Sequence, residues 1–252
     1  MNYSSERKKS ILFTVITVVL IAVLVISGIM ALNIYFPQKR EQQKFESLKQ
    51  SVVYQKEGDP MPENKYGDLI RRNGDFAGWL KIDDTSIDYP VMKPDESDPE
   101  FYLRRNFDKQ YSFPGTLFVG GNCNMDSDSF VIYGHNMVID TMFGELDSYA
   151  DDYFARKHPY ISLDTRTQSR QYKVFAAFQT KIYADSDDNF KYYEHFGTLS
   201  EDEYDETVQS VRNLSKIDLS DMPQNYEQLL FLSTCSYHTQ NGRFVVVAYR
   251  VK

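Results

Sequence analysis

The chain has 252 residues, with 28 Lys and Arg against 36 Asp and Glu, so its formal net charge is −8. Once Glu6 and the basic residues at 7–9 are set aside, 25 basic and 35 acidic side chains remain. This acidic balance argues against a nucleic-acid partner, because phosphate binding depends on clustered Lys and Arg. The 216 residues from position 37 onward suit one domain with a sizeable core.

The first predicted element is an apolar helix. Residues 11–32 carry no charge, and at about 1.5 Å per residue they reach about 33 Å, close to the thickness of a bilayer's hydrocarbon core. The run is too long for a typical cleavable signal segment, so we predict an uncleaved transmembrane signal-anchor over residues 11–36. The basic residues before it predict a cytoplasmic N-terminus, 1–10, and place the bulk of the chain outside the cell.

Two shorter helices are expected next. Residues 39–56 carry their apolar side chains on one stripe at helical spacing, and a second short helix over 63–72 ends at a turn signal, Asn73-Gly74. Together they form a predicted helical stalk over residues 37–72. The globular body then begins at residue 73.

The body, residues 73–252, is dominated by strand signals. Short apolar or alternating runs are bounded by Gly, Asn and Asp and give about eight strands without regular strand-helix alternation. The predicted strands are 79–82, 85–91, 115–119, 130–133, 160–163, 171–180, 228–234 and 243–251. A mainly β, mostly antiparallel barrel or sandwich is therefore favoured over a doubly wound sheet.

Two helices are predicted inside this body. Ser200 followed by Glu203 is a capping-box pattern, and apolar residues then recur at helical spacing up to Leu214, which predicts a helix of about 14 residues between two late strands. A further helix is expected over 142–157.

Cys235 and Arg243 flank a predicted hairpin symmetrically. The strands 228–234 and 243–251 are separated by a loop that contains the turn signal Asn241-Gly242. Directly opposed residues of an antiparallel pair have Cβ atoms about 4.5–5.5 Å apart, so the guanidinium would reach the neighbourhood of the thiol. A cation there favours a thiolate and stabilises an oxyanion, as acyl transfer requires.

A nucleophilic thiol also needs a base, and two of the four histidines qualify. His135 leaves an apolar strand at Gly134, whereas His238 lies in the hairpin loop, three residues after Cys235. Cys235 and His238 also resemble half of a metal site, but no second half with conventional spacing follows, and no metal or cofactor is predicted. The residues alone leave open that Cys235 is a small buried side chain and that the histidine and the arginine are structural.

The remaining cysteine, Cys123, lies in a polar loop. Cys123 and Cys235 are too few for a disulfide framework and differ in their settings, so we expect both thiols to be free.

At these residues the sequence resembles the sortases, the membrane-anchored cysteine transpeptidases of Gram-positive bacteria. Their signature TL-x-T-C, with an Arg in the next strand, is matched by FLSTC at 231–235 except at Phe231, with Arg243 eight residues on. The GHN around His135 resembles the family's histidine motif. The segments GWLKI at 78–82 and TSIDYPV at 85–91, with a helix inserted before the last two strands, are similar to class B members.

This resemblance implies an eight-stranded sortase-type β-barrel over 73–252 and a two-step acyl transfer without a cofactor. Cys235 would attack the Thr carbonyl in an NP-x-T-x-like sorting motif of a secreted protein, and an amine from a peptidoglycan precursor or a pilin would release the thioacyl-enzyme. The resemblance makes His135 the acid and base and Arg243 the group that holds the oxyanion or the substrate backbone. Ser233 and Thr234 would contact the substrate.

Two other functions stay open on the sequence. A secreted, membrane-anchored cysteine protease would use the same Cys and His but pass the acyl group to water. An extracytoplasmic binding or sensor domain would need no Cys235 at all.

Overall fold

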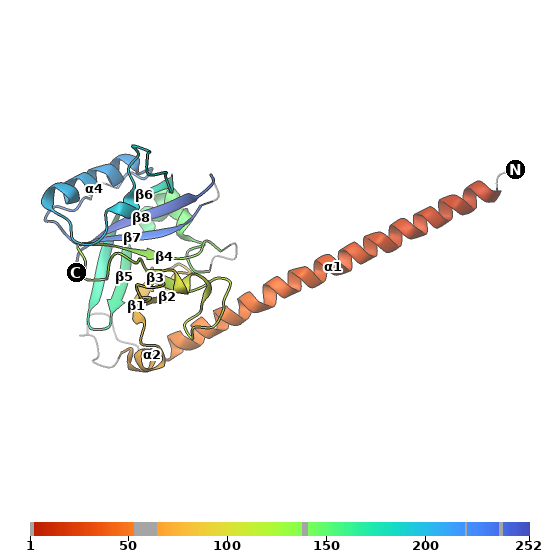
Figure 1. Ribbon diagram of the computed structural model, residues 1–252, viewed down its shortest axis with the longest axis horizontal. Coiled ribbons are helices and arrows are strands. Elements are labelled where there is room, and N and C mark those ends of the chain that lie inside the picture. The colour runs from red at the N-terminus through yellow and green to blue at the C-terminus, as the bar shows by residue number, and fades with distance from the viewer. Residues whose placement is uncertain (1–2, 53–64, 138–140, 220, 237–238) are drawn as a thin grey trace. The chain divides into compact units, whose positions relative to one another are not determined.

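The computed structural model describes residues 3–52, 65–137, 141–219, 221–236 and 239–252 (Figure 1). They divide into two compact units, Met1–Lys44 and Phe45–Lys252. The helix α1 (Tyr3–Gln50) supplies the first unit and its last turns belong to the second. The boundary between the units therefore falls inside the predicted stalk, residues 37–72.

The first unit carries the apolar segment. Ile11–Asn33, 23 residues with a mean hydropathy of 3.0, lies in α1 and is not buried against any other part of the described chain. Its length and composition suit a helix that crosses a membrane, and it overlaps the predicted anchor at 11–36. Pro37 does not end this helix, which runs on through the region predicted as a separate stalk helix.

The second unit is a β-barrel. Within the described residues eight strands close in the order β1-β2-β3-β4-β7-β8-β6-β5. Their bounds are β1 (Phe76–Lys81), β2 (Asp88–Met92), β3 (Leu117–Val119), β4 (Ser129–Tyr133), β5 (Tyr160–Thr165), β6 (Ser169–Lys181), β7 (Leu229–Cys235) and β8 (Gly242–Arg250). Closure removes exposed strand edges. The eight-stranded barrel predicted from the sequence is confirmed.

Most neighbouring strands are antiparallel, but two pairs are parallel. β2 runs parallel to β3, and β4 runs parallel to β7. The second of these pairs decides the geometry of the site, because parallel neighbours have their C-terminal ends at the same end of the barrel. The residues that follow β4 and β7 are therefore brought together there.

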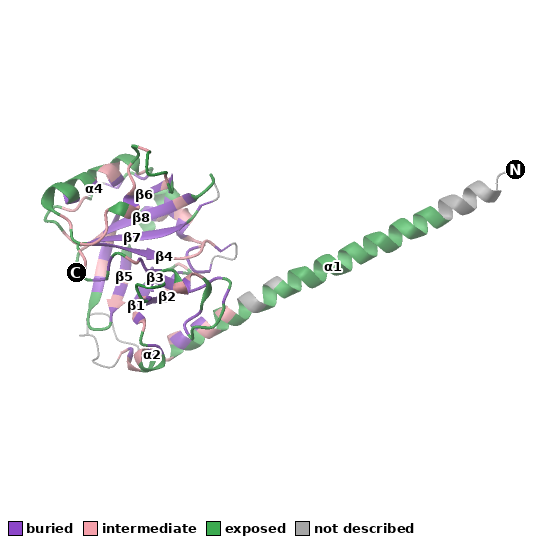
Figure 2. Ribbon diagram, in the orientation of Figure 1, coloured by how far each residue is buried: buried purple, intermediate pink, exposed green. Residues whose placement is uncertain are grey.

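The core fills the barrel and extends beneath its covering segments (Figure 2). β7, with the sequence LLFLSTC, is buried at every position except the last. A continuous buried run of this kind is typical of a strand that is covered on both faces. The exposed position that ends it is Cys235.

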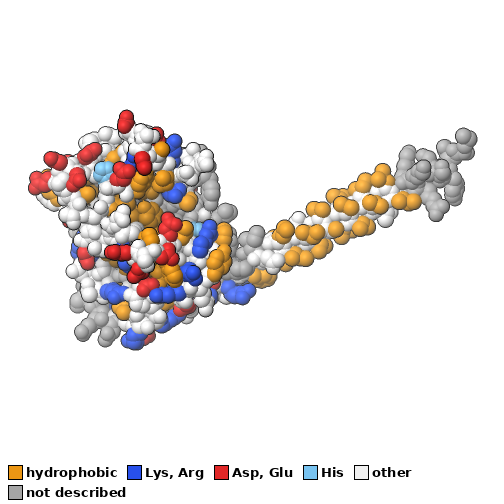
Figure 3. Space-filling view, viewed as in Figure 1, with side chains coloured by type: hydrophobic (Ala, Val, Ile, Leu, Met, Phe, Trp, Pro, Cys, Tyr) orange, Lys and Arg blue, Asp and Glu red, His pale blue; other side chains and the backbone are white. Residues whose placement is uncertain are grey.

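Besides α1, the described helical segments lie in the connections between the strands and before β1. They are α2 (Gly67–Arg72), η1 (Phe101–Arg104), η2 (Leu146–Ala150), α3 (Asp152–Lys157), η3 (Tyr192–Glu194) and α4 (Glu201–Leu214). The capping box predicted for α4 is confirmed, because Ser200 Oγ accepts from the Glu203 N–H and the Glu203 carboxylate accepts from the Ser200 N–H. Acidic side chains gather over α4 on the molecular surface (Figure 3).

The single helix predicted over 142–157 is wrong. Met142 has a left-handed backbone with a φ of 55°, and its backbone bridges Asn136 instead of starting a helix. Asp151 is extended, and its side chain accepts the N–H of Phe154, which caps a new helix. The segment is therefore divided into η2 and α3 by a residue whose side chain competes for the backbone.

The end of α1 is packed on the barrel. Phe45 and Leu48 are buried, and the Phe45 ring meets the Tyr89 ring edge-on, with centroids 5.4 Å apart. Lys49 forms an ion pair with Asp88 of β2. The predicted helix 39–56 thus forms as far as Gln50, and its last part, 53–56, lies outside the described residues.

Replacing Gly78 should destabilise the barrel. A Cβ at Gly78 of β1 would stand 2.2 Å from the Asp164 carbonyl oxygen of the paired strand β5, so Gly78→Ala forces two backbones apart at a cost of about 1–3 kcal/mol. The matched control is Gly74→Ala, where an added Cβ meets nothing within 4 Å. The free energy of unfolding of each variant is measured by denaturant unfolding of the full chain in detergent, followed by the fluorescence of the only tryptophan, Trp79. Equal free energies of unfolding for Gly78→Ala and Gly74→Ala would contradict the close packing at Gly78.

Candidate active site

Cys235 and Arg243 face each other across the last hairpin. β7 and β8 are antiparallel, with Cys235 directly opposite Arg243, and the Ser236 N–H donates to the Gly242 carbonyl at 3.0 Å where the hairpin closes. The register predicted from the sequence is confirmed. Cys235 is exposed and Arg243 is half-buried, so the thiol is accessible beside a cation.

His135 comes to the same end of the barrel from β4. Tyr133 pairs with Ser233 in the parallel ladder, and the Gly134 N–H donates to the Ser233 carbonyl at 3.2 Å. His135 therefore leaves β4 at the level at which Cys235 ends β7. Gly134 is required at this exit, because a Cβ there would lie 2.4 Å from the Leu117 side chain.

The electrostatic setting of His135 favours a neutral imidazole. Burial of the ring lowers its pKa to about 4, and the positive charge of Arg104 adds to the effect. Arg104 ends η1 and is oriented by a 2.7 Å hydrogen bond from its Nη1 to the Phe113 carbonyl. At neutral pH His135 is therefore a proton acceptor.

Ser233 and Thr234 are buried, with their hydroxyls bonded inside the protein. Ser233 Oγ lies 2.8 Å from the Tyr192 hydroxyl, and Thr234 Oγ1 donates to the Gly134 carbonyl at 2.8 Å. Thr234 thereby ties the strand that carries the cysteine to the strand that carries the histidine. Contact of either side chain with a substrate stays a prediction.

Two residues of this region were not identified from the sequence. Tyr192 is buried in η3 beneath the hairpin, and burial raises its pKa to about 12, so it stays protonated at neutral pH. Asn136 donates from Nδ2 to the Cys235 carbonyl at 3.0 Å. The position of Asn136 directly after the GH motif was the available signal, whereas nothing in the aromatic stretch around Tyr192 distinguished it.

The other histidines have different surroundings. His158 Nδ1 lies 2.9 Å from the Asp83 carbonyl, and His195 stacks on Phe190 and lies 3.1 Å from Thr207 Oγ1. His238, the alternative base, lies outside the described residues. Among the residues that the structure describes, no group of three His, Cys, Asp or Glu is placed to hold a metal ion.

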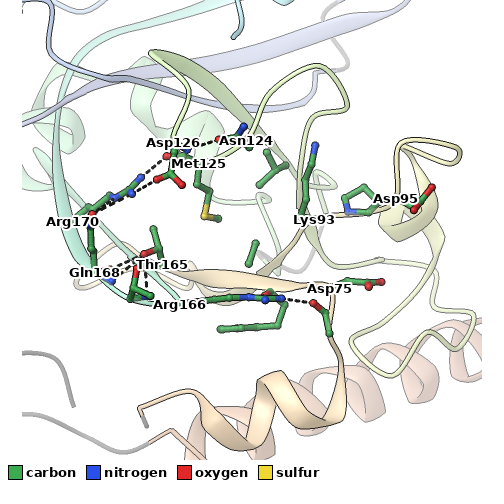
Figure 4. Close-up of a pocket in the computed structure, with 16 residues that line it drawn as sticks. Asp75, Lys93, Asp95, Asn124, Met125, Asp126, Thr165, Arg166, Gln168 and Arg170 are labelled. Carbon is green, nitrogen blue, oxygen red and sulfur yellow. Dashed lines mark hydrogen bonds and ion pairs between the residues drawn. The ribbon is translucent and has the colours of Figure 1, made fainter. Parts of the chain in front are cut away.

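A cavity of about 830 Å³ lies at the other end of the barrel (Figure 4). Arg170, which lines the cavity, lies near the start of β6, whereas Thr180, ten residues later on the same strand, pairs with Arg243. At about 3.3 Å per strand residue, the backbones of Arg170 and Thr180 are about 33 Å apart. Arg170 is bonded to Asp126 and to the Met125 carbonyl, and the ammonium of Lys93 donates to three loop carbonyls. The cavity is therefore separate from the cysteine site.

Known proteins resemble this chain over most of its length. Residues 80–251 match the sortase domain family. Sortase B of Staphylococcus aureus (strain NCTC 8325 / PS 47) is 25% identical over 244 residues, which cover 95% of this chain and 96% of that protein. Sortase B of Listeria monocytogenes serovar 1/2a is 28% identical over 247 residues, which cover 94% of this chain and 96% of that protein.

Solved structures show the same likeness. The X-ray structure of Clostridium perfringens sortase B is 30% identical, with a TM-score of 0.65, and the match covers 74% of this chain and 99% of that one. A structure of sortase B complexed with triglycine has a TM-score of 0.74 at 24% identity, and the match covers 85% of this chain and 99% of that one. This likeness shows the shared fold.

The strand ladders set an exposed cysteine, at one end of a closed barrel, between the ends of the strands that lead to an arginine and a histidine, an arrangement typical of a nucleophilic cysteine. The family match covers more than half of the chain, and the chain belongs to the sortase family of cysteine transpeptidases, in class B.

The setting of His135 can be tested by titration. Following the His135 ring protons by NMR in the full chain in detergent should give a midpoint of about 4, with the resonance identified by its loss in His135→Gln. Arg104→Ala removes a nearby positive charge, which favours the imidazolium, so the midpoint should rise while burial still holds it below 6.5. Arg105→Ala is the matched control and should leave it unchanged. A midpoint near 6.5 in the unmodified chain, or no response to Arg104→Ala, would contradict this account.

Proposed function

We propose that this class B sortase cleaves a C-terminal sorting motif of secreted proteins through a thioacyl-enzyme on Cys235 and transfers the acyl group to an amine. The observation that carries the proposal is the register of β7, which sets an exposed thiol opposite Arg243 and level with His135. The three residue types supply a nucleophile, a base and an oxyanion ligand.

In the first step neutral His135 takes the thiol proton as the sulfur of Cys235 attacks the carbonyl carbon of the motif threonine. Negative charge develops on the carbonyl oxygen, where the Arg243 guanidinium stabilises it. The imidazolium then gives its proton to the leaving amine as the C–N bond breaks, and the thioacyl-enzyme is left. The lowered pKa of His135 makes its imidazolium a stronger acid for this donation to the leaving amine.

In the second step an acceptor amine attacks the thioester carbon. His135 takes a proton from the amine, the C–S bond breaks, and the proton returns to the sulfur of Cys235. One peptide bond is broken and one is formed, so no cofactor enters the balance.

Arg243 is held in place before substrate arrives. Its Nη1 donates to the Gly242 carbonyl at 3.0 Å, which fixes the guanidinium beside its own turn and leaves further N–H groups for a substrate oxygen. Ser233 and Thr234 are buried, so we propose that they reach a bound motif mainly through their backbone, with their hydroxyls holding the strand ends.

The substrate class follows the relatives. NP-x-T-x-like motifs on secreted proteins are the proposed donors, and an amine of a peptidoglycan precursor or a pilin is the proposed acceptor. One solved sortase B is described as a complex with its substrate and another as a complex with triglycine, a short peptide with a free amine. We propose that α4, inserted before β7, forms one wall of the groove that takes the motif.

The proposed location is the cell membrane. The apolar helix Ile11–Asn33 would span the bilayer once, with residues 1–10 in the cytoplasm and the barrel outside the cell, where secreted substrates are available. Membership of a transpeptidase family decides against the dedicated protease and the non-catalytic sensor that the sequence left open.

Single substitutions distinguish the roles. Cys235→Ala should abolish cleavage of a fluorogenic sorting peptide, and His135→Ala should slow it by a factor on the order of 10²–10⁴, because the base and the acid are lost. His238→Ala is the matched control and should keep near-normal activity. Added triglycine should raise product formation by the unmodified enzyme. Full activity after His135→Ala, or no response to the amine, would rule out the proposed mechanism.

A further inference from the structure

We propose that Asn136 is a positioning residue that fixes the distance between the histidine's strand end and the cysteine's strand end. The inference rests on the proposed function, and it assigns a role to a residue beside the catalytic groups. Asn136 follows His135 directly, and its amide nitrogen bonds to the backbone of Cys235.

The backbone ladder between β4 and β7 stops just before the site. Its last bond on this side runs from the Gly134 N–H to the Ser233 carbonyl. Two residues further on both strands, the next bond of a parallel ladder would join the backbone N–H of Asn136 to the Cys235 carbonyl. The Asn136 backbone instead pairs with the backbone of Met142, and beside this pair the Phe143 N–H donates to the His135 carbonyl at 2.9 Å.

The Asn136 side chain makes the connection that the backbone leaves out. Nδ2 donates to the Cys235 carbonyl at 3.0 Å, which ties the residue after the base to the nucleophile itself. Thr234 Oγ1 donates in the opposite direction, to the Gly134 carbonyl at 2.8 Å. Two reciprocal side-chain bonds therefore bracket the strand ends that carry His135 and Cys235.

A carboxylate fixes the orientation of this amide. Asn136 Nδ2 also donates to Asp147 Oδ2, from η2, at 2.9 Å. Both partners of the amide are acceptors, so its NH₂ group and not its oxygen must face them. The bond to the carboxylate is charge-assisted and stronger than a neutral one. Asp147 thus holds the amide in the single orientation that reaches Cys235.

The consequence is catalytic because proton transfer and attack require close, oriented groups. A misplacement of about 1 Å can cost about 10²-fold in rate. Loss of the hydrogen bond from the Asn136 side-chain amide to the Cys235 carbonyl should let the two strand ends separate without affecting the motif-binding surface. The rate of the chemical step should therefore fall while binding of the motif is retained.

The test compares Asn136→Asp and Asn136→Ala with the unmodified full chain in detergent, on a fluorogenic sorting peptide. Asn136→Asp keeps the size but removes both donors and sets a carboxylate against Asp147. In both variants kcat should fall about 10–100-fold, with KM within about twofold. Asp147→Asn should give a smaller loss in the same direction. Asn124→Asp, the same change at an exposed position beside the cavity at the other end of the barrel, keeps the oxygen that accepts from the Asp126 N–H; it is the matched control and should be silent.

Counting reactive thiols separates positioning from a loss of folding. Cys123 is buried and Cys235 is exposed, so a folded chain should react rapidly with a chromogenic disulfide at one thiol and an unfolded chain at two. The proposal expects one rapid thiol in every variant. It is overturned if kcat stays within about twofold of the unmodified enzyme, or if the loss of kcat matches the fraction of chain that exposes Cys123. Failure of the proposed function is distinguishable, because the unmodified enzyme would then show no cleavage that depends on Cys235.

Discussion

The pairing of β7 on both of its edges is the constraint on which the site depends. The strand is antiparallel to β8 and parallel to β4, so one buried element sets Cys235 opposite Arg243 and level with His135 at the same time. A shift of one residue in either register would turn the thiol to the other face of the sheet. The buried run before Cys235 prevents such a shift, because polar or exposed positions would replace core residues.

Burial then separates the roles of the three side chains. The half-buried imidazole loses its positive charge at neutral pH, since burial and Arg104 both lower its pKa, whereas the guanidinium of Arg243 keeps its charge. The strand that ends in an exposed thiol is therefore flanked by one strand that leads to a neutral imidazole and another that begins beside a guanidinium. Side-chain hydrogen bonds from Thr234 and Asn136 maintain this arrangement where the backbone ladder ends.

Features with a local signal could be predicted from the sequence, and features that depend on distant contacts could not. The hairpin register followed from two apolar runs around Asn241-Gly242, and α4 followed from its capping box. The burial of Ser233 was not predicted. β7 is covered on both faces, and the alternation of apolar and polar residues along a strand indicates burial of one face only. The prediction of one helix over 142–157 failed where Asp151 caps a new helix, and Tyr192 contacts Ser233 across 41 residues of sequence.

The most direct measurement of the central claim is the covalent intermediate. The full chain in detergent is mixed with a sorting peptide in the absence of an amine, quenched in acid, digested and analysed by mass spectrometry. The account predicts an adduct with the mass of the acyl fragment on the peptide that contains Cys235, and an unmodified Cys123. Cleavage of the sorting peptide without an adduct on Cys235, or with one on Cys123, would contradict it.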